Sequence, residues 1–299
     1  MEIKDKIIYY KNKYTYSCLQ KTLQMIDGKI PYSLLKGDVL SLQAYQILNQ
    51  RNYNDVDILI PRKYLQLLDE ILRENGYVQN NHSRHDEIFL LSCSHQTFPY
   101  YCMKNNIILD INHDIFWGEY QNKRIDIKEF LSDAMEMVLY GVKVKTLPPL
   151  KTMIQLILHH YKDMNSIYLL ATRKSIRYDM FKDIYYLLKN NLDTITVDKL
   201  YAMSAEYEII PYVYYVLYYT EQIFDDEILK QYVEAFRTVE GEALLNCYGL
   251  CEKERKEWKY DFKSRLESEE LYSLIKDDLN EHDLNKISIN KRIFMGVSE

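Results

Sequence analysis

The chain has 299 residues, of which 47% are hydrophobic, and its 44 acidic and 38 basic residues give a formal net charge of −6. This length favours two domains with a sizeable core, and the acidic balance argues against nucleic-acid binding through the overall field. The most apolar segment, residues 209–219, contains Pro211 and is too short to cross a bilayer. The five cysteines form no C-x-x-C pair and the N-terminus shows no signal peptide, so we expect a reduced, cytoplasmic protein without a membrane partner.

Strand and helix patterns alternate over the first half of the chain. Asp38 is expected to be the N-cap of the second helix, and Pro61 suits the first turn of the third. Beta-rich stretches then follow an apolar alternation with turn residues between them. In chain order we predict a helix at 13–27, a strand at 32–35, a helix at 38–48, a strand at 55–60, a helix from Pro61 to a C-cap at Gly76, strands at 86–92, 98–104 and 107–116, a short helix at 126–134 and a hairpin around Tyr140 and Gly141.

Helical patterns dominate the second half of the chain. Pro148 and Pro149 mark a predicted boundary between one domain at 1–148 and another at 149–299. From residue 150 apolar residues recur at i, i+3, i+4, i+7, i+8 and i+11, which is typical of a helix with one buried stripe. Strands in the first half and helices in the second predict an α+β fold with an all-α second domain. Further helices are expected near 179–190, 196–208, 211–224, 225–237 and 253–279.

Two aspartates stand inside one otherwise apolar strand. Asp55 and Asp57 share a face because side chains alternate along a strand, and Val56, Ile58 and Ile60 take the other face, where a helix can cover them. Repulsion between two such close carboxylates should raise the pKa of one of them unless a cation lies between them. Hard oxygen ligands suit Mg²⁺, which also bridges phosphate oxygens. The pair therefore predicts a magnesium site.

Other residues on the expected elements fit the same chemistry. Asp110 is the one acid inside the apolar strand at 107–116 and would supply a third carboxylate in the same sheet. Lys36 and Gly37 lie at a strand-to-helix junction, where exposed N–H groups and a lysine can receive phosphates. Arg51, four residues before Asp55, could hold a phosphate with its forked donors. This ordered set favours metal-assisted phosphoryl or nucleotidyl transfer.

The segments LKGDVL, RNYNDVDILI and ILDIN resemble the nucleotidyltransferases of the DNA polymerase beta superfamily. They are most similar to its bacterial group of uncharacterised nucleotidyltransferases, with the pattern lKG…R…DiDlLv…vDlH. The later segments VKTLPPLKTMIQLILHHYKD and YDMFKDIYYLL also look like helices of that group, so the resemblance spans about residues 30–225. It implies a small mixed sheet flanked by helices, followed by a helical domain.

The resemblance also implies an activity and roles for residues. The activity is metal-dependent transfer of a nucleoside monophosphate from a nucleoside triphosphate (NTP) to an acceptor hydroxyl, with release of pyrophosphate. By the family pattern, Asp55 and Asp57 would bind two Mg²⁺ ions, and Asp110 would bind one ion and help deprotonate the acceptor. The NTP, ATP or another, would be bound by the nucleotide-binding set, which comprises Lys36, Gly37, Asp38 and Arg51.

The sequence departs from the family pattern at two places near the expected site. Asp38 stands where the wider superfamily has Gly or Ser facing the phosphates, and its carboxylate would repel them unless turned away as the N-cap. Asn112 takes the place of the group's histidine, with His113 one position later on the opposite face of the strand. Both departures concern the nucleotide and acceptor sides of the expected site.

Four histidines and one further aspartate outside this set each have two interpretations. His82 and His85 could hold a metal or belong to a solvated loop that borders the active cleft. His159 or His160 could face the nucleotide, because the family helix carries a histidine here, or be a partly buried histidine of the core. Asp183 could line the cleft or be a surface acid.

Two charged segments are also open to more than one interpretation. Arg173, Lys174 and Arg177 form the one notable basic cluster, which could hold phosphates or RNA. Residues 252–270 carry charges of both signs and are expected to form a solvated helix with Trp258 and Phe262 packed inward.

Three functions remain open from the sequence. The first is an active two-metal nucleotidyltransferase whose acceptor is a small molecule, a protein or an RNA end. The second is a toxin-type nucleotidyltransferase acting on tRNA or protein, which the acidic composition disfavours for RNA. The third is a non-catalytic nucleotide-binding member of the fold, suggested by Asp38 in the phosphate turn.

Overall fold

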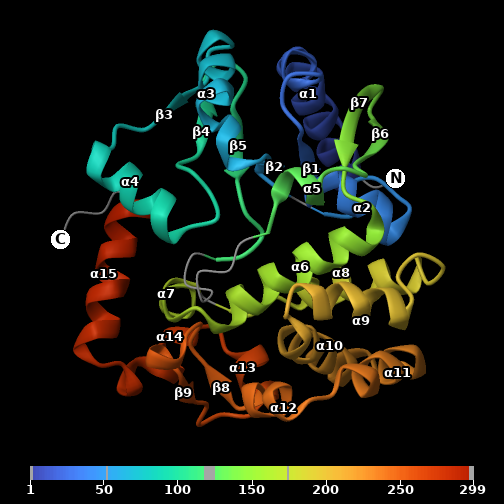
Figure 1. The fold of residues 1–299 in the computed structure, drawn as a ribbon. Helices are drawn as coiled ribbons and strands as arrows, with labels where there is room; N and C mark the ends of the chain where they lie inside the picture. Colours follow the sequence, from blue (N-terminus) through green and yellow to red (C-terminus); the bar gives the residue numbers. More distant parts are fainter. Residues whose placement is uncertain (1–2, 52, 118–124, 174, 296–299) are drawn as a thin grey trace. The chain divides into compact units, whose positions relative to one another are not determined.

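A computed structural model gives the fold of the chain in two compact units (Figure 1). The described residues up to Thr152 form the first unit, and those from Met153 form the second. The division falls inside one helix, a few residues after the boundary predicted at Pro148 and Pro149. The described residues are 3–51, 53–117, 125–173 and 175–295.

The first unit is built on a seven-stranded mixed sheet with the strand order β3-β4-β5-β2-β1-β7-β6. The central β2 runs antiparallel to β1 and parallel to β5, and β1 runs parallel to β7. The strands are β1 (Ser33–Leu35), β2 (Asp55–Leu59), β3 (Val78–Gln79), β4 (Tyr100–Cys102), β5 (Ile107–Asn112), β6 (Met135–Leu139) and β7 (Val142–Thr146). The helices of this unit are α1 (Ile3–Ile26), α2 (Gly37–Tyr45), the 3-10 helix η1 (Arg62–Tyr64), α3 (Leu65–Glu74), α4 (Arg84–Cys93) and α5 (Ile127–Phe130).

One face of this sheet is buried under helices. α1 and α3 lie side by side over it (Figure 1). One apolar core contains Val56 and Ile58 of β2, Ile60 directly after this strand, Leu19 of α1 and Leu72 of α3. Val56, Ile58 and Ile60 share one face because side chains alternate along a strand. The opposite face carries Asp55, Asp57 and the buried Leu59. The predicted packing of the apolar face of β2 under helices is confirmed.

The strand predicted at 86–92 is wrong, because these residues belong to α4. Ser83 is the N-cap of this helix: its Oγ accepts a hydrogen bond from the Asp86 N–H at 3.0 Å and donates to the Asp86 carboxylate at 2.7 Å. This reciprocal pair is a helix-start signal of the capping-box kind. The apolar run that follows is therefore helical and adds no strand to the sheet.

The second unit is helical, with one two-stranded hairpin formed by β8 and β9. α6 (Pro149–Asn165) enters it, and the helix predicted from residue 150 onward is confirmed, but its single buried stripe is wrong, because every residue from Thr152 to Leu158 is buried. Its further elements are α7 (Ile167–Thr172), α8 (Tyr178–Lys189), α9 (Val197–Glu206), α10 (Ile210–Phe224), α11 (Glu227–Phe236), α12 (Val239–Leu245), β8 (Cys247–Tyr248), the 3-10 helix η2 (Glu252–Glu254), β9 (Lys256–Glu257), α13 (Phe262–Glu267), α14 (Leu271–Ile275), the 3-10 helix η3 (Lys276–Asp278) and α15 (Glu281–Met295).

The single helix predicted over 253–279 is wrong, because the segment is divided into short elements. β9 pairs with β8, the Trp258 ring lies 4.5 Å from that of Tyr248, and Asp261 begins α13 by accepting the Ser264 N–H at 2.8 Å. Arg265 is buried against aromatic rings and donates to the Tyr219 hydroxyl at 2.9 Å. The charged run is thus not a solvated helix, since Glu254 and Arg265 are both buried.

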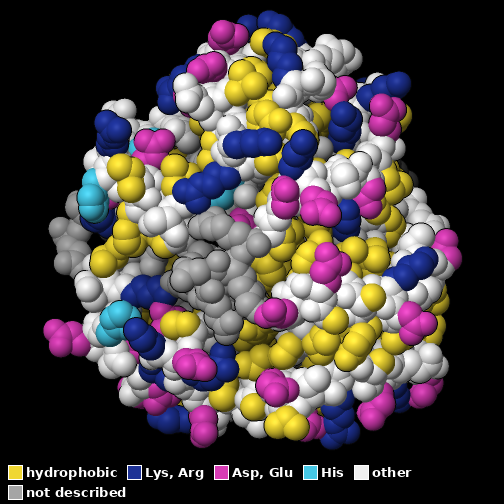
Figure 2. Space-filling model, in the orientation of Figure 1, with side chains coloured by type: hydrophobic (Ala, Val, Ile, Leu, Met, Phe, Trp, Pro, Cys, Tyr) yellow, Lys and Arg dark blue, Asp and Glu magenta, His cyan; other side chains and the backbone are white. Residues whose placement is uncertain are grey.

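Charged side chains of both signs lie interspersed over most of the face drawn in Figure 2. This mixture agrees with the mildly acidic net charge of −6. Among the described residues, no helix combines the length and the apolar character that a bilayer span requires.

Candidate active site

The three predicted carboxylates lie on neighbouring strands in the first unit. β2 and β5 pair in parallel, so that Asp57 stands opposite Asp110 and Asp55 stands opposite Ile108. Because opposite residues share a face, the side chains of Asp55, Asp57 and Asp110 all project from one face of the sheet, and that of Val56 projects from the other. The structure therefore brings together residues that are 53 or 55 positions apart in the sequence.

A lysine and an asparagine amide contact the carboxylate of Asp57. The Lys36 ammonium is 3.0 Å from Asp57 Oδ1, and the Asn112 amide donates to the same oxygen at 3.3 Å. Burial, together with the charges of Asp57 and Asp55, raises the pKa of Asp110 to about 7, although Lys36 opposes the shift. One lysine thus does not fully compensate three gathered acids.

The donor set fits a hard divalent cation. Carboxylate oxygens are the ligands that Mg²⁺ prefers, and an added positive charge would relieve the repulsion that raises the Asp110 pKa. The ligand atoms are not gathered tightly: among the described residues, the three-residue set whose ligand atoms all lie within 4.8 Å of one another is His159, His160 and Asp163 rather than the aspartates. In the structure the Lys36 ammonium lies beside Asp57, where a cation would lie.

The turn between β1 and α2 presents backbone donors beside these carboxylates. Lys36 occupies the N-cap position with φ 52°, and Gly37 follows with φ 46°. The first helical hydrogen bond runs from the Leu40 N–H to the Lys36 carbonyl at 3.0 Å. The N–H groups before it have no partner within the helix, so they form an N-terminus of the kind that binds anions.

Asp38 is not the N-cap, which corrects the sequence prediction. It lies in the first turn of α2 with 0% of its surface exposed. Its Oδ1 accepts the Asn49 N–H at 3.1 Å, and its Oδ2 accepts hydrogen bonds from the hydroxyls of Tyr53 and of Tyr140, the latter at 2.9 Å. Both carboxylate oxygens of Asp38 are therefore already hydrogen-bonded within the first unit.

Arg51 is half-buried in the segment that joins α2 to β2. Residue 52, next to it, lies outside the described residues. The phosphate-binding role of Arg51 stays a prediction.

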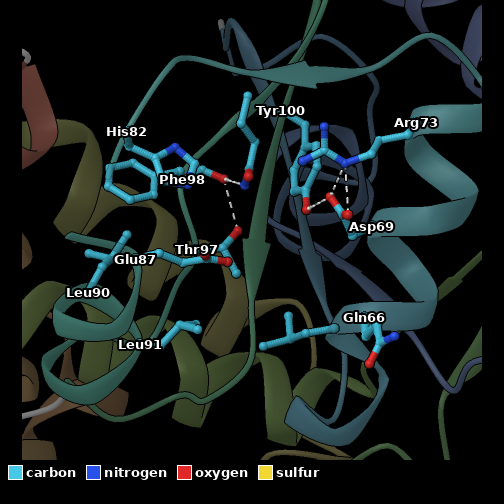
Figure 3. Close-up of a pocket in the computed structure, with 12 residues that line it drawn as sticks. Gln66, Asp69, Arg73, His82, Glu87, Leu90, Leu91, Thr97, Phe98 and Tyr100 are labelled. Atoms are coloured by element: carbon cyan, nitrogen blue, oxygen red, sulfur yellow. Dashed lines mark hydrogen bonds and ion pairs between the residues drawn. The ribbon is translucent and has the colours of Figure 1, made fainter. Parts of the chain in front are cut away.

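A separate pocket of about 350 Å³ lies in the first unit, between α3, α4 and β4 (Figure 3). The His82 ring lines it and stacks on Phe98 at 4.1 Å, while the Asp69 carboxylate accepts hydrogen bonds from Arg73 and from Tyr100. None of the three aspartates of β2 and β5 lines this pocket. His82 therefore lines a pocket that is separate from the three aspartates. His85 is exposed in α4 rather than in a loop.

Histidines and acids of the second unit have their own environment. His159 Nε2 lies 3.2 Å from Asp163 Oδ2, and His160 is buried. The buried Asp163 also binds the Arg173 guanidinium at 2.6 Å, and Lys162 lies 3.6 Å away. Two neighbouring cations make this set a poor cation site despite its tight spacing.

The other residues singled out from the sequence divide between the core and the surface. Asp183 is buried in α8, so the surface alternative for it is wrong. Arg177, one of the basic cluster, pairs with Asp179 at 3.4 Å, and Lys174 lies outside the described residues. The cluster is therefore partly neutralised by acids, since Arg173 is bound to Asp163.

Acid should weaken the second unit through Asp163. Burial alone would raise the pKa of this carboxyl, but Lys162, Arg173 and His160 together hold it below its usual value. A carboxyl with a lowered folded-state pKa contributes stability above its unfolded pKa of about 3.9, and that contribution is lost as the pH falls through the folded value. We expect thermal melting across this range to show the advantage of the wild type over Asp163→Asn shrinking below about pH 4. An advantage that grows on acidification would contradict this.

Comparison with known proteins gives the family. The profile of the family described as uncharacterised nucleotidyltransferase matches residues 14–225, which is more than half of the chain. The chain belongs to this family. The predicted nucleotidyltransferase resemblance and the predicted α+β fold are thereby confirmed. No curated protein matches this nucleotidyltransferase.

Solved structures show only a distant likeness. The antibiotic-resistance factor ANT(2'')-Ia in solution is 13% identical, with 64% of this chain and 90% of that chain covered and a TM-score of 0.37. ANT(2'')-Ia in complex with adenylyl-2''-tobramycin is 12% identical, with 64% and 96% covered and a TM-score of 0.39. An antigenic nucleotidyltransferase-like protein from Paracoccidioides brasiliensis is 14% identical, with 74% and 93% covered and a TM-score of 0.42. At these TM-scores the likenesses carry no argument about the site.

Sequence reasoning missed several polar residues around the nucleotidyltransferase site. Asn112 had been noted as a departure from the family pattern, but not as a donor to Asp57. Tyr53, Tyr140 and Asn49 gave no signal, because tyrosine and asparagine are frequent throughout this chain. The acid at position 38 departs from the family pattern, but nothing local in the sequence indicates which donors surround it.

Proposed function

We propose that this nucleotidyltransferase moves a nucleoside monophosphate from an NTP to an acceptor hydroxyl and releases pyrophosphate, with Mg²⁺ as its cofactor. The observation that carries the proposal is the register of β2 and β5, which sets Asp57 opposite Asp110 beside the Lys36–Gly37 turn. Family membership supports an enzyme of this type. The proposed catalytic residues all lie in the predicted domain 1–148, with 149–299 as a helical domain.

In this proposal Asp55, Asp57 and Asp110 hold Mg²⁺. Two ions, when bound, would neutralise charge on the attacking and leaving oxygens of the displacement. Asp110 also accepts the proton of the acceptor hydroxyl. Its place on the strand next to Asp57 supports both roles.

The turn before α2 receives the triphosphate. The N–H groups at the start of the helix point to the anion, and Gly37 allows the phosphates to approach the backbone closely. Lys36 turns its ammonium from Asp57 to the phosphates when NTP binds, and Arg51 adds a second cation to the same anion. The positive φ of Lys36 supports this role, because a non-glycine residue keeps that conformation at a cost.

The buried position of Asp38 supports a catalytic protein over a non-catalytic one. The non-catalytic alternative rested on a carboxylate that would repel phosphates from the turn. Both oxygens of Asp38 accept hydrogen bonds inside the unit and are fully buried, so its charge is not presented at the surface of the turn.

Metal removal gives the first test. Incubation with each labelled NTP, ATP first, and Mg²⁺ should release pyrophosphate, and excess EDTA should stop the release because the three acids lose their counter-ions. Added Mg²⁺ should restore it. The matched control is the double variant Asp55→Ala, Asp57→Ala. Equal release by this variant and the wild type would overturn the assignment of the carboxylates.

A further inference from the structure

A buried carboxylate lies one residue after the glycine of the phosphate turn. Asp38 has no exposed surface, and its two oxygens accept hydrogen bonds from the Asn49 N–H, the Tyr53 hydroxyl and the Tyr140 hydroxyl. Burying a carboxylate is costly unless donors surround it, and an apolar residue of similar size is often as stable at such a place. The burial of this charge therefore calls for a role beyond holding the core together.

Tyr53 joins three parts of the first unit. Its ring atoms lie 3.4 to 3.6 Å from the point where a Cβ on Gly37 would stand, so the ring packs directly against the turn. Its hydroxyl binds Asp38, and its carbonyl accepts the Lys11 ammonium of α1 at 2.8 Å. Two residues later the chain reaches Asp55. One side chain thus connects the anion-binding turn to the start of the carboxylate strand.

The tyrosine hydroxyls around Asp38 remain donors at neutral pH. Burial, with the charge of Asp38 and neighbouring tyrosines, raises the pKa of Tyr53 far above its usual value, and burial with Asp38 does the same to the pKa of Tyr140. Neither hydroxyl ionises near pH 7, so both keep the proton that they can donate to the carboxylate.

We propose that Asp38 and Tyr53 are positioning residues that couple the phosphate turn to the carboxylate strand of this nucleotidyltransferase. Neither side chain touches the nucleotide. Their hydrogen bond fixes Gly37 relative to Asp55, so that the triphosphate and its metal ligands meet at one place. The inference rests on the proposed function and names the residues that make its two halves act together.

A pair of tyrosine variants separates positioning from simple stability. Tyr53→Phe and Tyr140→Phe each remove one hydroxyl from the same oxygen of Asp38. Tyr140 also lies 2.6 Å from the Asn49 side-chain oxygen, so its variant loses at least as many polar contacts. Only Tyr53 packs on Gly37 and leads into Asp55. A purely structural role predicts that Tyr140→Phe is as harmful as Tyr53→Phe.

The measurement is calorimetry with a non-hydrolysable NTP and Mg²⁺, beside thermal melting. We expect Tyr53→Phe to weaken nucleotide binding about fivefold or more, which is the lower end of usual coupling between sites. Tyr140→Phe should stay within about twofold of the wild type, although both melt earlier. If Asp38→Asn folds, its nucleotide affinity should fall by as much as that of Tyr53→Phe. If it does not fold, the comparison of Tyr53→Phe with Tyr140→Phe tests the proposal.

Two results would count against the proposal, and they can be told apart. If the wild type binds nucleotide and both tyrosine variants bind it equally well, the positioning role is wrong while the proposed function stands. If the wild type binds no NTP under any condition, the proposed function is wrong and the positioning role falls with it.

Discussion

Asp57→Asn should lower pyrophosphate release about 10³-fold, because loss of a metal ligand removes on the order of 4 kcal/mol of transition-state stabilisation. Asp57 is the central acid of the site: Asp110 lies opposite it, Lys36 lies 3.0 Å from it, and Asn112 donates to it. The amide keeps the shape of the side chain but not its charge. Release would be measured with the NTP that the wild type accepts.

The matched control for this variant is Asp69→Asn. Asp69 is also an acid of the first unit with two hydrogen-bonding neighbours, Arg73 and Tyr100, but it lines the separate pocket of Figure 3. We expect this control to keep most of the activity. Activity of Asp57→Asn within about tenfold of the wild type, a difference of only about 1.4 kcal/mol, would show that Asp57 is not a metal ligand.

Gly37→Val should lower nucleotide affinity about tenfold or more, a change of at least about 1.4 kcal/mol in binding free energy. Gly37 has φ 46°, where a β-branched residue is strained, and its new methyl groups would press on the Tyr53 ring. The turn must shift to relieve both. Calorimetry with a non-hydrolysable NTP and Mg²⁺ gives the affinity.

Gly28→Val is the control that measures the effect of backbone strain without contact between the new side chain and its neighbours. Gly28 follows α1 with φ 79°, and nothing lies within 4 Å of the point where its Cβ would stand. Both variants should lose about 1–2 kcal/mol of stability, since a left-handed residue other than glycine costs that much. Only Gly37→Val should lose nucleotide binding. Equal losses of affinity in the two variants would mean that the turn is not a nucleotide site.

The alternation of apolar and acidic residues predicted the carboxylate strand well. Asp55 and Asp57 share a face because the period of a strand is two, and no distant contact can change that. The pairing with Asp110 was predictable only as membership of one sheet. The parallel direction of the two strands needs a crossover between them, which here includes α3 and α4, and the apolar run of α4 predicts a strand instead.

The environment of Asp38 could not be predicted from local patterns. An acid after a glycine at a helix start looks like an N-cap, but Lys36 takes that position with a positive φ. The donors that make burial of Asp38 possible, Tyr53 and Tyr140, are 15 and 102 residues away. A single sequence contains no short-range signal for contacts of that separation.

The parallel register of β2 and β5 has a consequence for how this site tolerates change in length. The 47 residues between Leu59 and Ile107 carry η1, α3, β3, α4 and β4, and insertions in their connecting loops leave Asp57 opposite Asp110. A single residue inserted within β5 ahead of Asp110 would instead turn that carboxylate into the apolar core, where Leu109 now lies. The site therefore tolerates changes of length in these loops, but not in the few residues of β5 before Asp110.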